Sequence, residues 1–174
     1  MSLFDTLVKY GMPFVPKPIV GRIARRYVAG DTLDDAVRTL REINEEGAMG
    51  TVDVLGEEVR EPAKATSAVA EYLRLLDRIE DAKLDANISI KPTMLGLKID
   101  QALCEENLAA IAGRASELDS FVRIDMEDHT CTDGTIQLYR RMHENHGSTV
   151  GIVLQSYLHR TVADINDLLP LNPN

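Results

Sequence analysis

The chain has 174 residues, of which 44% are hydrophobic, and its formal net charge is −9. That size and apolar content are sufficient for one folded domain, and they exclude a disordered or fibrous chain. The acidic balance argues against a nucleic-acid surface, because phosphate binding needs a clustered basic face and the lysines and arginines here are scattered. We therefore expect a globular protein with no nucleic-acid partner.

The cysteines and the apolar runs indicate where the protein works. Cys104 and Cys131 have no paired spacing, so we expect two free thiols in a reducing cytoplasm. No run approaches the roughly 18 apolar residues of a membrane span and no leader pattern is present, so we expect neither export nor anchoring. The basic stretch 22–26 favours a helix packed on its own domain, with peripheral membrane contact as the alternative.

Residues 1–46 are predicted to form an N-terminal helical arm that precedes a second region, residues 47–174. Asp31 and Thr32 can cap one helix of this arm, and Gly47 can end it. Beyond Gly47 the hydrophobic pattern changes, because short apolar runs begin to alternate with helical spacing. The apolar stripe of the helix before Gly47 consists of Leu33, Ala36, Val37, Leu40 and Ile43.

Residues 47–174 divide into four units of about 32 residues each, which is the size of a βα repeat. Each unit pairs an apolar run typical of a strand with a helical pattern, so the strands are predicted to be parallel. We expect Thr132 to be the N-cap of the third helix. The predicted strands are 52–55, 87–91, 121–125 and 150–155, and the predicted helices include 69–79, 108–118, 136–142 and 162–169.

The strands are nearly continuous in their apolar character, which predicts burial on both faces in a barrel or a doubly wound sheet. After the first strand the sequence is Gly-Glu-Glu-Val (56–59), acidic where a doubly wound fold would hold a pyrophosphate. A barrel is therefore favoured. A closed eight-stranded barrel needs about 200 residues or more, so we expect an α/β fold that is part of a (β/α)8 TIM-type barrel, with about four parallel βα units.

Three of the predicted strands end on one polar or charged residue, namely Lys91, Asp125 and Gln155. These ends lie at one edge of a parallel sheet, where α/β barrels keep their active sites. Lys91 could bind a carboxylate or, if desolvated, form a Schiff base; the alternative is a lysine that simply leaves a strand end. Gln155 offers the donor and acceptor that an amide needs to bind an imide edge, such as that of a flavin or uracil ring.

The segment 125–129 holds three carboxylates and an imidazole directly after a strand, which could indicate a divalent metal or an acid/base pair. Asp125 continues the alternation of the strand and is expected to point inward. Asp128 and His129 fall in the following loop and are expected to be solvated. No second His or Cys cluster supplies further ligands, so we predict no metal site.

Four of these segments, in this order and at this spacing, resemble the bacterial monofunctional proline dehydrogenases. They are Thr-Val-Asp-Val-Leu-Gly-Glu (51–57), Ser-Ile-Lys-Pro-Thr (89–93), Val-Arg-Ile-Asp-Met-Glu (122–127) and Val-Leu-Gln-Ser-Tyr-Leu (153–158). The resemblance implies a distorted eight-stranded barrel that uses FAD to oxidise L-proline to pyrroline-5-carboxylate and passes the electrons to a quinone.

The resemblance also implies roles for four residues. Lys91 would bind the proline carboxylate beside the flavin and orient the substrate. Asp125 would be the catalytic carboxylate that organises cationic groups around the substrate. Met126 would contact the cofactor through its backbone, and Gln155 would hydrogen-bond the isoalloxazine ring.

Enzymes of this family continue into a strand with arginine and glycine that holds FAD and into a final helix with an arginine pair, and this sequence ends at Asn174 before either. We therefore expect weak or absent FAD binding and no turnover from this chain alone. The residues leave two alternatives open. One is a metal- or Schiff-base-dependent barrel enzyme, and the other is a non-catalytic half-barrel that self-associates through unpaired strand edges.

Overall fold

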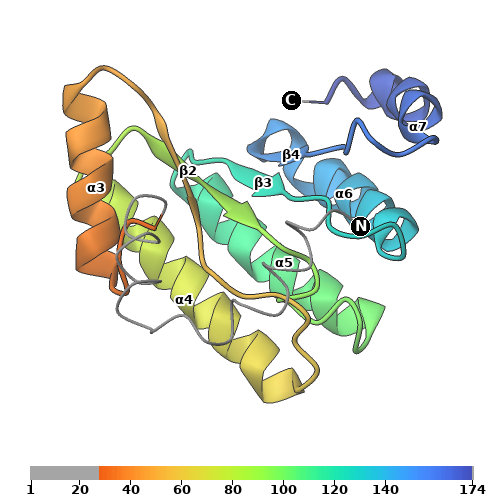
Figure 1. Ribbon diagram of the computed structural model, residues 1–174, viewed down its shortest axis with the longest axis horizontal. Helices are drawn as coiled ribbons and strands as arrows, with labels where there is room; N and C mark the ends of the chain where they lie inside the picture. Colours follow the sequence, from red (N-terminus) through yellow and green to blue (C-terminus); the bar gives the residue numbers. More distant parts are fainter. Residues whose placement is uncertain (1–27, 174) are drawn as a thin grey trace, which may run out of the picture.

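The computed structural model describes residues 28–173, which form a parallel sheet with helices packed against it (Figure 1). The basic stretch 22–26 and most of the predicted arm lie outside the described residues. From the arm, the structure shows α3 (Leu33–Glu45), and the hydroxyl of Thr32 accepts a hydrogen bond from the backbone N–H of Asp35 at 3.2 Å. This confirms the predicted helix and its cap.

The sheet contains β1 (Gly50–Asp53), β2 (Ala86–Ile90), β3 (Val122–Ile124) and β4 (Val150–Ile152). The strands are paired in chain order and all neighbours are parallel, which confirms the predicted arrangement. All four strands end earlier than predicted. Their terminal polar residues lie just beyond the ladder, so the side chains at the carboxyl edge are free to contact one another.

Four α-helices follow the strands: α4 (Pro62–Asp81), α5 (Gln101–Glu117), α6 (Thr132–His146) and α7 (Thr161–Leu168). Two short 3-10 turns, η2 (Gly147–Thr149) and η3 (Leu169–Leu171), complete the described elements. The prediction that Thr132 caps α6 is wrong by one residue. Cys131 is the N-cap, and Thr132 is the buried first residue of the helix.

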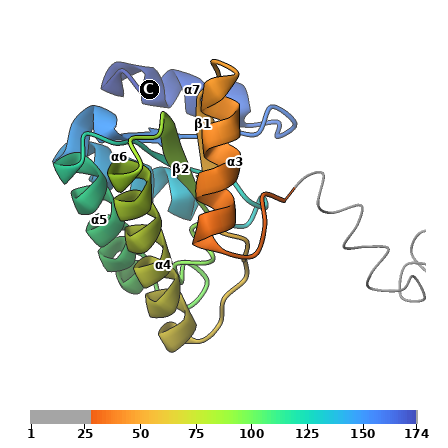
Figure 2. The ribbon, with the colours of Figure 1, turned by 90° about the vertical axis from the view of Figure 1, so that its left-hand side faces the viewer.

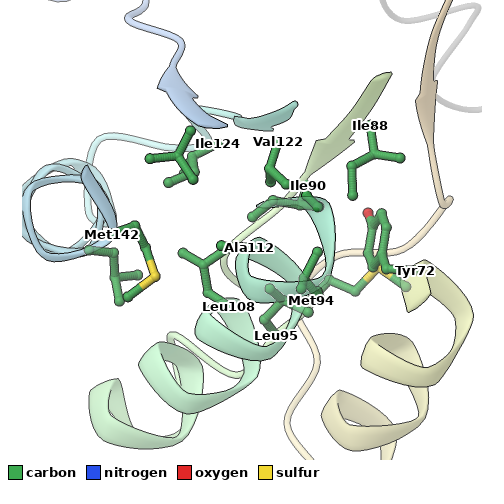
Figure 3. Close-up of a cluster of buried hydrophobic side chains, with 14 of the residues drawn as sticks. Tyr72, Ile88, Ile90, Met94, Leu95, Leu108, Ala112, Val122, Ile124 and Met142 are labelled. Carbon is green, nitrogen blue, oxygen red and sulfur yellow. The ribbon is translucent and has the colours of Figure 1, made fainter. Parts of the chain in front are cut away.

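The core lies between the sheet and the helices α4, α5 and α6 (Figures 1 and 3). Figure 2 shows α3 beside β1, near the edge of the sheet. Alternation along the strands directs one set of side chains into this core, because successive residues of a strand point to opposite faces. Fully buried residues of this set are Ile88, Ile90, Val122 and Ile124, which lie over Tyr72, Leu108 and Met142.

The opposite face of the sheet is polar, so the prediction that both faces are buried is wrong for the described part of the chain. Thr51 is exposed, and Asp53, Ser89 and Arg123 are only partly buried. In the register of the ladder these residues occupy matching positions, with Asp53 beside Ser89 and Ser89 beside Arg123. Within the apolar runs, residues thus alternate between an apolar face of the sheet, which packs against the helices, and a polar face, which points away from them.

Across residues 28–173, none of the helices combines the length and the apolar composition that crossing a lipid bilayer requires.

The substitution Ile124→Ala tests the position of the core. Ile124 is fully buried in the middle of the sheet, so removal of its side chain should lower the free energy of unfolding by about 2–5 kcal/mol. Urea unfolding measures this change. Val162 is 71% exposed on α7, and Val162→Ala, the control, should change the free energy by no more than about 0.5 kcal/mol. If the two substitutions lowered the free energy of unfolding equally, Ile124 would not be part of the core.

Candidate functional site

The carboxyl ends of the strands border a cavity of about 440 Å³. All four residues to which the sequence assigned a role lie in its lining, although they come from three different strand ends. Five of the eight lining side chains are carboxylates, so the cavity is strongly acidic. The lining consists of Glu57, Glu58, Lys91, Asp125, Met126, Glu127, Asp128 and Gln155.

Lys91 lies among the carboxylates at this edge. Its ammonium forms an ion pair with Asp53, and its Nζ atom is 3.8 Å from Oδ2 of Asp125. The parallel register produces this arrangement: Asp53 is paired with Ser89, and the ladder continues when the N–H of Asp125 donates to the carbonyl of Ile90 at 2.9 Å. Lys91 therefore emerges between two carboxylates, one from each neighbouring strand.

Asp53 is a site residue that was not predicted from the sequence. The segment 52–55 was predicted as a strand, but no role was assigned to any of its side chains. The signal that could have found Asp53 is the one that found Lys91 and Asp125, a single charged residue near the carboxyl end of an apolar run.

The surroundings of Lys91 keep it protonated. Partial burial acts to lower the pKa of Lys91, but the hydrogen bond and charge of Asp53, with the charges of Asp125 and Glu127, outweigh it, so the pKa is raised. The ammonium has three donors, and Asp53 takes one of them. Lys91 can thus offer a positive charge and further N–H groups to a carboxylate in the cavity.

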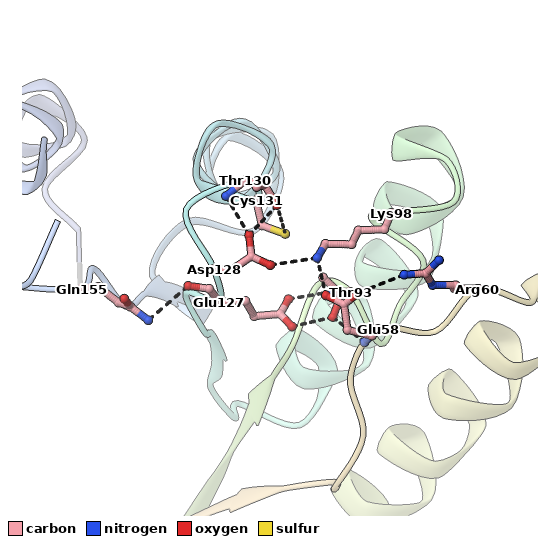
Figure 4. Close-up of polar contacts among 9 residues, drawn as sticks. All are labelled: Glu58, Arg60, Thr93, Lys98, Glu127, Asp128, Thr130, Cys131 and Gln155. Carbon is pink, nitrogen blue, oxygen red and sulfur yellow. Dashed lines mark hydrogen bonds and ion pairs between the residues drawn. The ribbon is translucent and has the colours of Figure 1, made fainter. Parts of the chain in front are cut away.

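Thr93 connects the segments that follow three of the strands (Figure 4). Its backbone N–H donates to Oε2 of Glu127 at 2.8 Å, its hydroxyl donates to the other oxygen of that carboxylate, and the hydroxyl oxygen accepts from the N–H of Glu58 at 2.9 Å. Burial raises the pKa of Glu127, although the bonds from Thr93 act in the opposite direction. The segments after β1, β2 and β3 are held together by this one buried threonine.

Lys98 forms a second link across the cavity rim. Its ammonium contacts Glu58 and lies 2.8 Å from Oδ2 of Asp128. The hydrogen bond from Lys98, together with those from Thr130, lowers the pKa of Asp128. Asp128 is exposed, as predicted, and it is in addition an ion-pair partner of Lys98. His129 is exposed, as predicted.

Gln155 and Met126 contact each other at the cavity. The side-chain amide of Gln155 donates to the carbonyls of Met126, at 3.3 Å, and Glu127, at 3.1 Å. The N–H of Met126 donates to Oδ1 of Asp125 at 3.0 Å, while its side chain packs in the core. Both backbone groups of Met126 thus have internal partners. A carbonyl oxygen can accept a second hydrogen bond, so that of Met126 can still contact a ligand.

These side chains fit one part of a flavin and not another. The side-chain oxygen of Gln155 accepts no hydrogen bond within residues 28–173, so it can accept one from the imide N–H of an isoalloxazine ring. A pyrophosphate needs clustered cations, whereas the cavity lining contains five carboxylates and one lysine. Over the same residues, no group of three His, Cys, Asp or Glu side chains is placed to hold a metal ion.

Comparison with known proteins gives one family. A family profile described as "Proline dehydrogenase" matches residues 36–172. Proline dehydrogenase 1 of Bacillus subtilis (strain 168) is 35% identical over 151 residues, which are 87% of this chain and 50% of that protein. Proline dehydrogenase of Deinococcus radiodurans is 34% identical over 156 residues, with the same two shares. The chain spans about half the length of the curated relatives it matches.

Solved structures give the fold. Proline utilization A (PutA) from Bdellovibrio bacteriovorus, inactivated by N-propargylglycine, is similar with a TM-score of 0.78 over 87% of this chain and 19% of that chain, at 20% identity. PutA from Bradyrhizobium japonicum is similar with a TM-score of 0.66 over 82% of this chain and 16% of that chain, also at 20% identity. The predicted fold class, several βα units of a TIM-type barrel, is confirmed.

The substitution Glu127→Gln tests the electrostatics of the site. Burial raises the pKa of Glu127, so the folded chain binds the proton of this carboxyl more tightly than the unfolded chain does. The stability that this proton contributes is fully present below the pKa of Glu127 in the unfolded chain, and it is lost as the pH rises through the pKa of Glu127 in the folded chain. Glu127→Gln should therefore gain stability relative to the unmodified chain between about pH 4 and pH 7.

Urea unfolding across this pH range measures the difference. Glu106 is an exposed glutamate on α5, and Glu106→Gln controls for the loss of one negative charge. Each variant is compared with the unmodified chain at every pH. If the stability difference for Glu127→Gln changes with pH no more than the difference for Glu106→Gln, the pKa of Glu127 is not raised.

Proposed function

The chain belongs to the proline dehydrogenase family, and from this premise we propose that it carries part of the active site that oxidises L-proline to pyrroline-5-carboxylate. One observation supports the proposal more than any other: a protonated lysine lies among carboxylates at the carboxyl edge of the sheet. Proline is a zwitterion with a carboxylate and a secondary ammonium, so it needs a cation and an anionic surrounding within one small cavity.

Lys91 binds the carboxylate of proline in this proposal. Its raised pKa keeps the ammonium charged because Asp53, Asp125 and Glu127 surround it. The same protonation argues against a Schiff base, since a nucleophilic lysine must be neutral. The metal-dependent alternative lacks support among residues 28–173, where no ligand cluster is placed to hold a metal.

Asp125 is proposed to act on the cationic groups around the substrate. Its carboxylate is held from two sides, by the N–H of Met126 at 3.0 Å and by Lys91 at 3.8 Å. A carboxylate in this position stabilises the secondary ammonium of bound proline and opposes rotation of the Lys91 side chain. Both effects orient the substrate, and correct orientation supplies a large part of the acceleration in many enzymes.

FAD, when bound, would accept the hydride that leaves the ring carbon next to the nitrogen of proline, while the nitrogen loses a proton and the C=N bond of pyrroline-5-carboxylate forms. The residues of this chain that would hold it are Gln155, through its side-chain amide, and Met126, through its backbone carbonyl. The described residues at the cavity offer no cationic cluster for the pyrophosphate, so those cations must come from elsewhere in an active protein. We expect this chain alone to bind FAD weakly and to turn over no proline.

We also propose an electron acceptor and a cellular location for the protein. The resemblance to proline dehydrogenases supports a quinone as the electron acceptor, and a cytoplasmic location fits two buried, unpaired cysteines. In the described sheet β1 and β4 each have a single neighbour. These edges can pair with further strands of a barrel or with a second copy of the chain, and light scattering against concentration distinguishes the two.

A chimera tests the proposed function. We would join residues 1–172 to the carboxy-terminal half of B. subtilis proline dehydrogenase 1 and measure bound flavin and proline-dependent reduction of a dye. Lys91→Met should lower kcat/KM for proline by about 100-fold or more, because it removes a charged partner of the substrate carboxylate.

Lys64 is an exposed lysine on α4 whose side chain is 66% accessible, and Lys64→Met provides the control, with kcat/KM changed by no more than about twofold. A folded, flavin-loaded chimera that does not oxidise proline, or one in which Lys91→Met behaves like Lys64→Met, would contradict the proposed function.

A further inference from the structure

Tyr72 joins the helical layer to the charged edge of the sheet. It lies on α4 and is fully buried, and its helical spacing predicts an ordinary core residue. Figure 3 shows its hydroxyl directed toward the strands. The hydroxyl oxygen is 3.3 Å from Oδ1 of Asp53 and 3.2 Å from the carbonyl oxygen of Ser89. Its polar end therefore reaches the residues that precede and partner Lys91.

The hydroxyl of Tyr72 is a permanent donor. Burial, together with the charge of Asp53, raises the pKa of Tyr72, so the phenol keeps its proton. Both groups within reach, a carboxylate and a carbonyl, are acceptors. The single hydroxyl hydrogen is therefore donated to Asp53, to Ser89 or to both, and it cannot be donated to the cavity.

The two oxygens of Asp53 have separate partners. Oδ1 accepts from Tyr72, and Oδ2 forms the ion pair with the ammonium of Lys91. A carboxylate held at both oxygens has a fixed orientation, whereas one held at a single oxygen can rotate toward water. The side chain of Asp53 is already 29% exposed. Without the hydroxyl of Tyr72, its carboxylate can therefore turn toward water.

We propose that Tyr72 is a positioning residue, which holds the carboxylate of Asp53 and through it the ammonium of Lys91 in the cavity. The consequence for catalysis rests on the proposed function, because Lys91 must bind a substrate carboxylate for its position to affect the rate. The chain of contacts from Tyr72 to Asp53 to Lys91 does not rest on that function. It can be tested on the 174-residue chain without FAD or proline.

The state of Lys91 depends on groups from several elements. Asp53 faces it from β1, and Asp125 and Glu127 face it from the segment after β3. Glu57, Glu58 and Asp128 line the rest of the same cavity. Asp53 makes the direct hydrogen bond, so its displacement removes the strongest favourable contact and leaves partial burial to oppose the charge. Loss of the Tyr72 hydroxyl should then make Lys91 easier to deprotonate.

Competitive acylation with acetic anhydride measures this effect. Labelling of Lys91 is followed by mass spectrometry across a pH series, because only the neutral amine reacts. Tyr72→Phe should increase the labelling rate of Lys91 at a fixed pH about threefold or more, and Asp53→Asn should increase it further. Tyr139 is also a fully buried tyrosine, and its hydroxyl has no partner in the described part of the chain, so Tyr139→Phe should leave the rate unchanged.

Two outcomes would overturn the proposal. If Tyr72→Phe labels like Tyr139→Phe while Asp53→Asn changes the rate, then Tyr72 does not position Lys91. If Asp53→Asn changes nothing, the contact between Asp53 and Lys91 is absent. A failed chimera with the expected labelling would instead contradict only the proposed function, so the two failures can be told apart.

A second measurement covers the case in which Tyr72→Phe does not fold. In the chain labelled with 13C-tyrosine, Asp53→Asn should shift the ring Cζ resonance of Tyr72 and leave that of Tyr139 in place. An unmoved Tyr72 resonance would show that its hydroxyl does not contact Asp53, and the proposal would be wrong.

Discussion

Parallel pairing in chain order is the constraint on which the site depends. Four strands in the order β1-β2-β3-β4 bring all their carboxyl ends to one edge, where charged or polar side chains lie at the end of a strand or within three residues after it. The register then decides which of these side chains meet. Asp53 beside Ser89 and the bond from Asp125 to Ile90 leave Lys91 between two carboxylates. A slip of one residue in either pair would direct the side chains to the opposite face.

This arrangement is electrostatically uneven. Five carboxylates line one cavity, and their negative charges repel one another. Lys91 and Lys98 offset part of this repulsion. Hydrogen bonds from Thr93 offset part of the free-energy cost of burying the Glu127 carboxylate. The side chains of Lys91 and Asp53 are 21% and 29% exposed, so water screens the pair and its net contribution to stability is modest. The cluster is better explained as preparation of a binding site than as a source of stability.

The sequence was sufficient for the elements and for the part of the site that follows strands. Short apolar runs separated by helical spacing indicated four parallel units, and the ends of those runs indicated Lys91, Asp125 and Gln155. The resemblance to proline dehydrogenases, which four short segments carried, is confirmed by the family to which the chain belongs. The roles of the individual residues stay predictions.

Contacts between distant segments could not be predicted in this way. Thr93 binds Glu127, and Tyr72 binds Asp53, across separations of 34 and 19 residues, and no local pattern specifies either pair. Tyr72 matches the apolar stripe of its helix because its ring is buried; only packing decides where its hydroxyl lies. The expectation that both faces of the sheet are buried failed for a related reason, since short polar residues within apolar runs did not distinguish a strand covered on one face from a strand covered on two.

A double-mutant cycle measures whether the strand register couples Lys91 to Asp53. The free energies of unfolding of the unmodified chain, Lys91→Met, Asp53→Asn and the double variant are measured by urea unfolding at neutral pH. We expect the effects of the two substitutions not to be additive, with a coupling of about 0.5 kcal/mol or more in favour of the pair. Effects that add to within about 0.3 kcal/mol would show that the two charges do not interact and that the register does not couple Lys91 to Asp53.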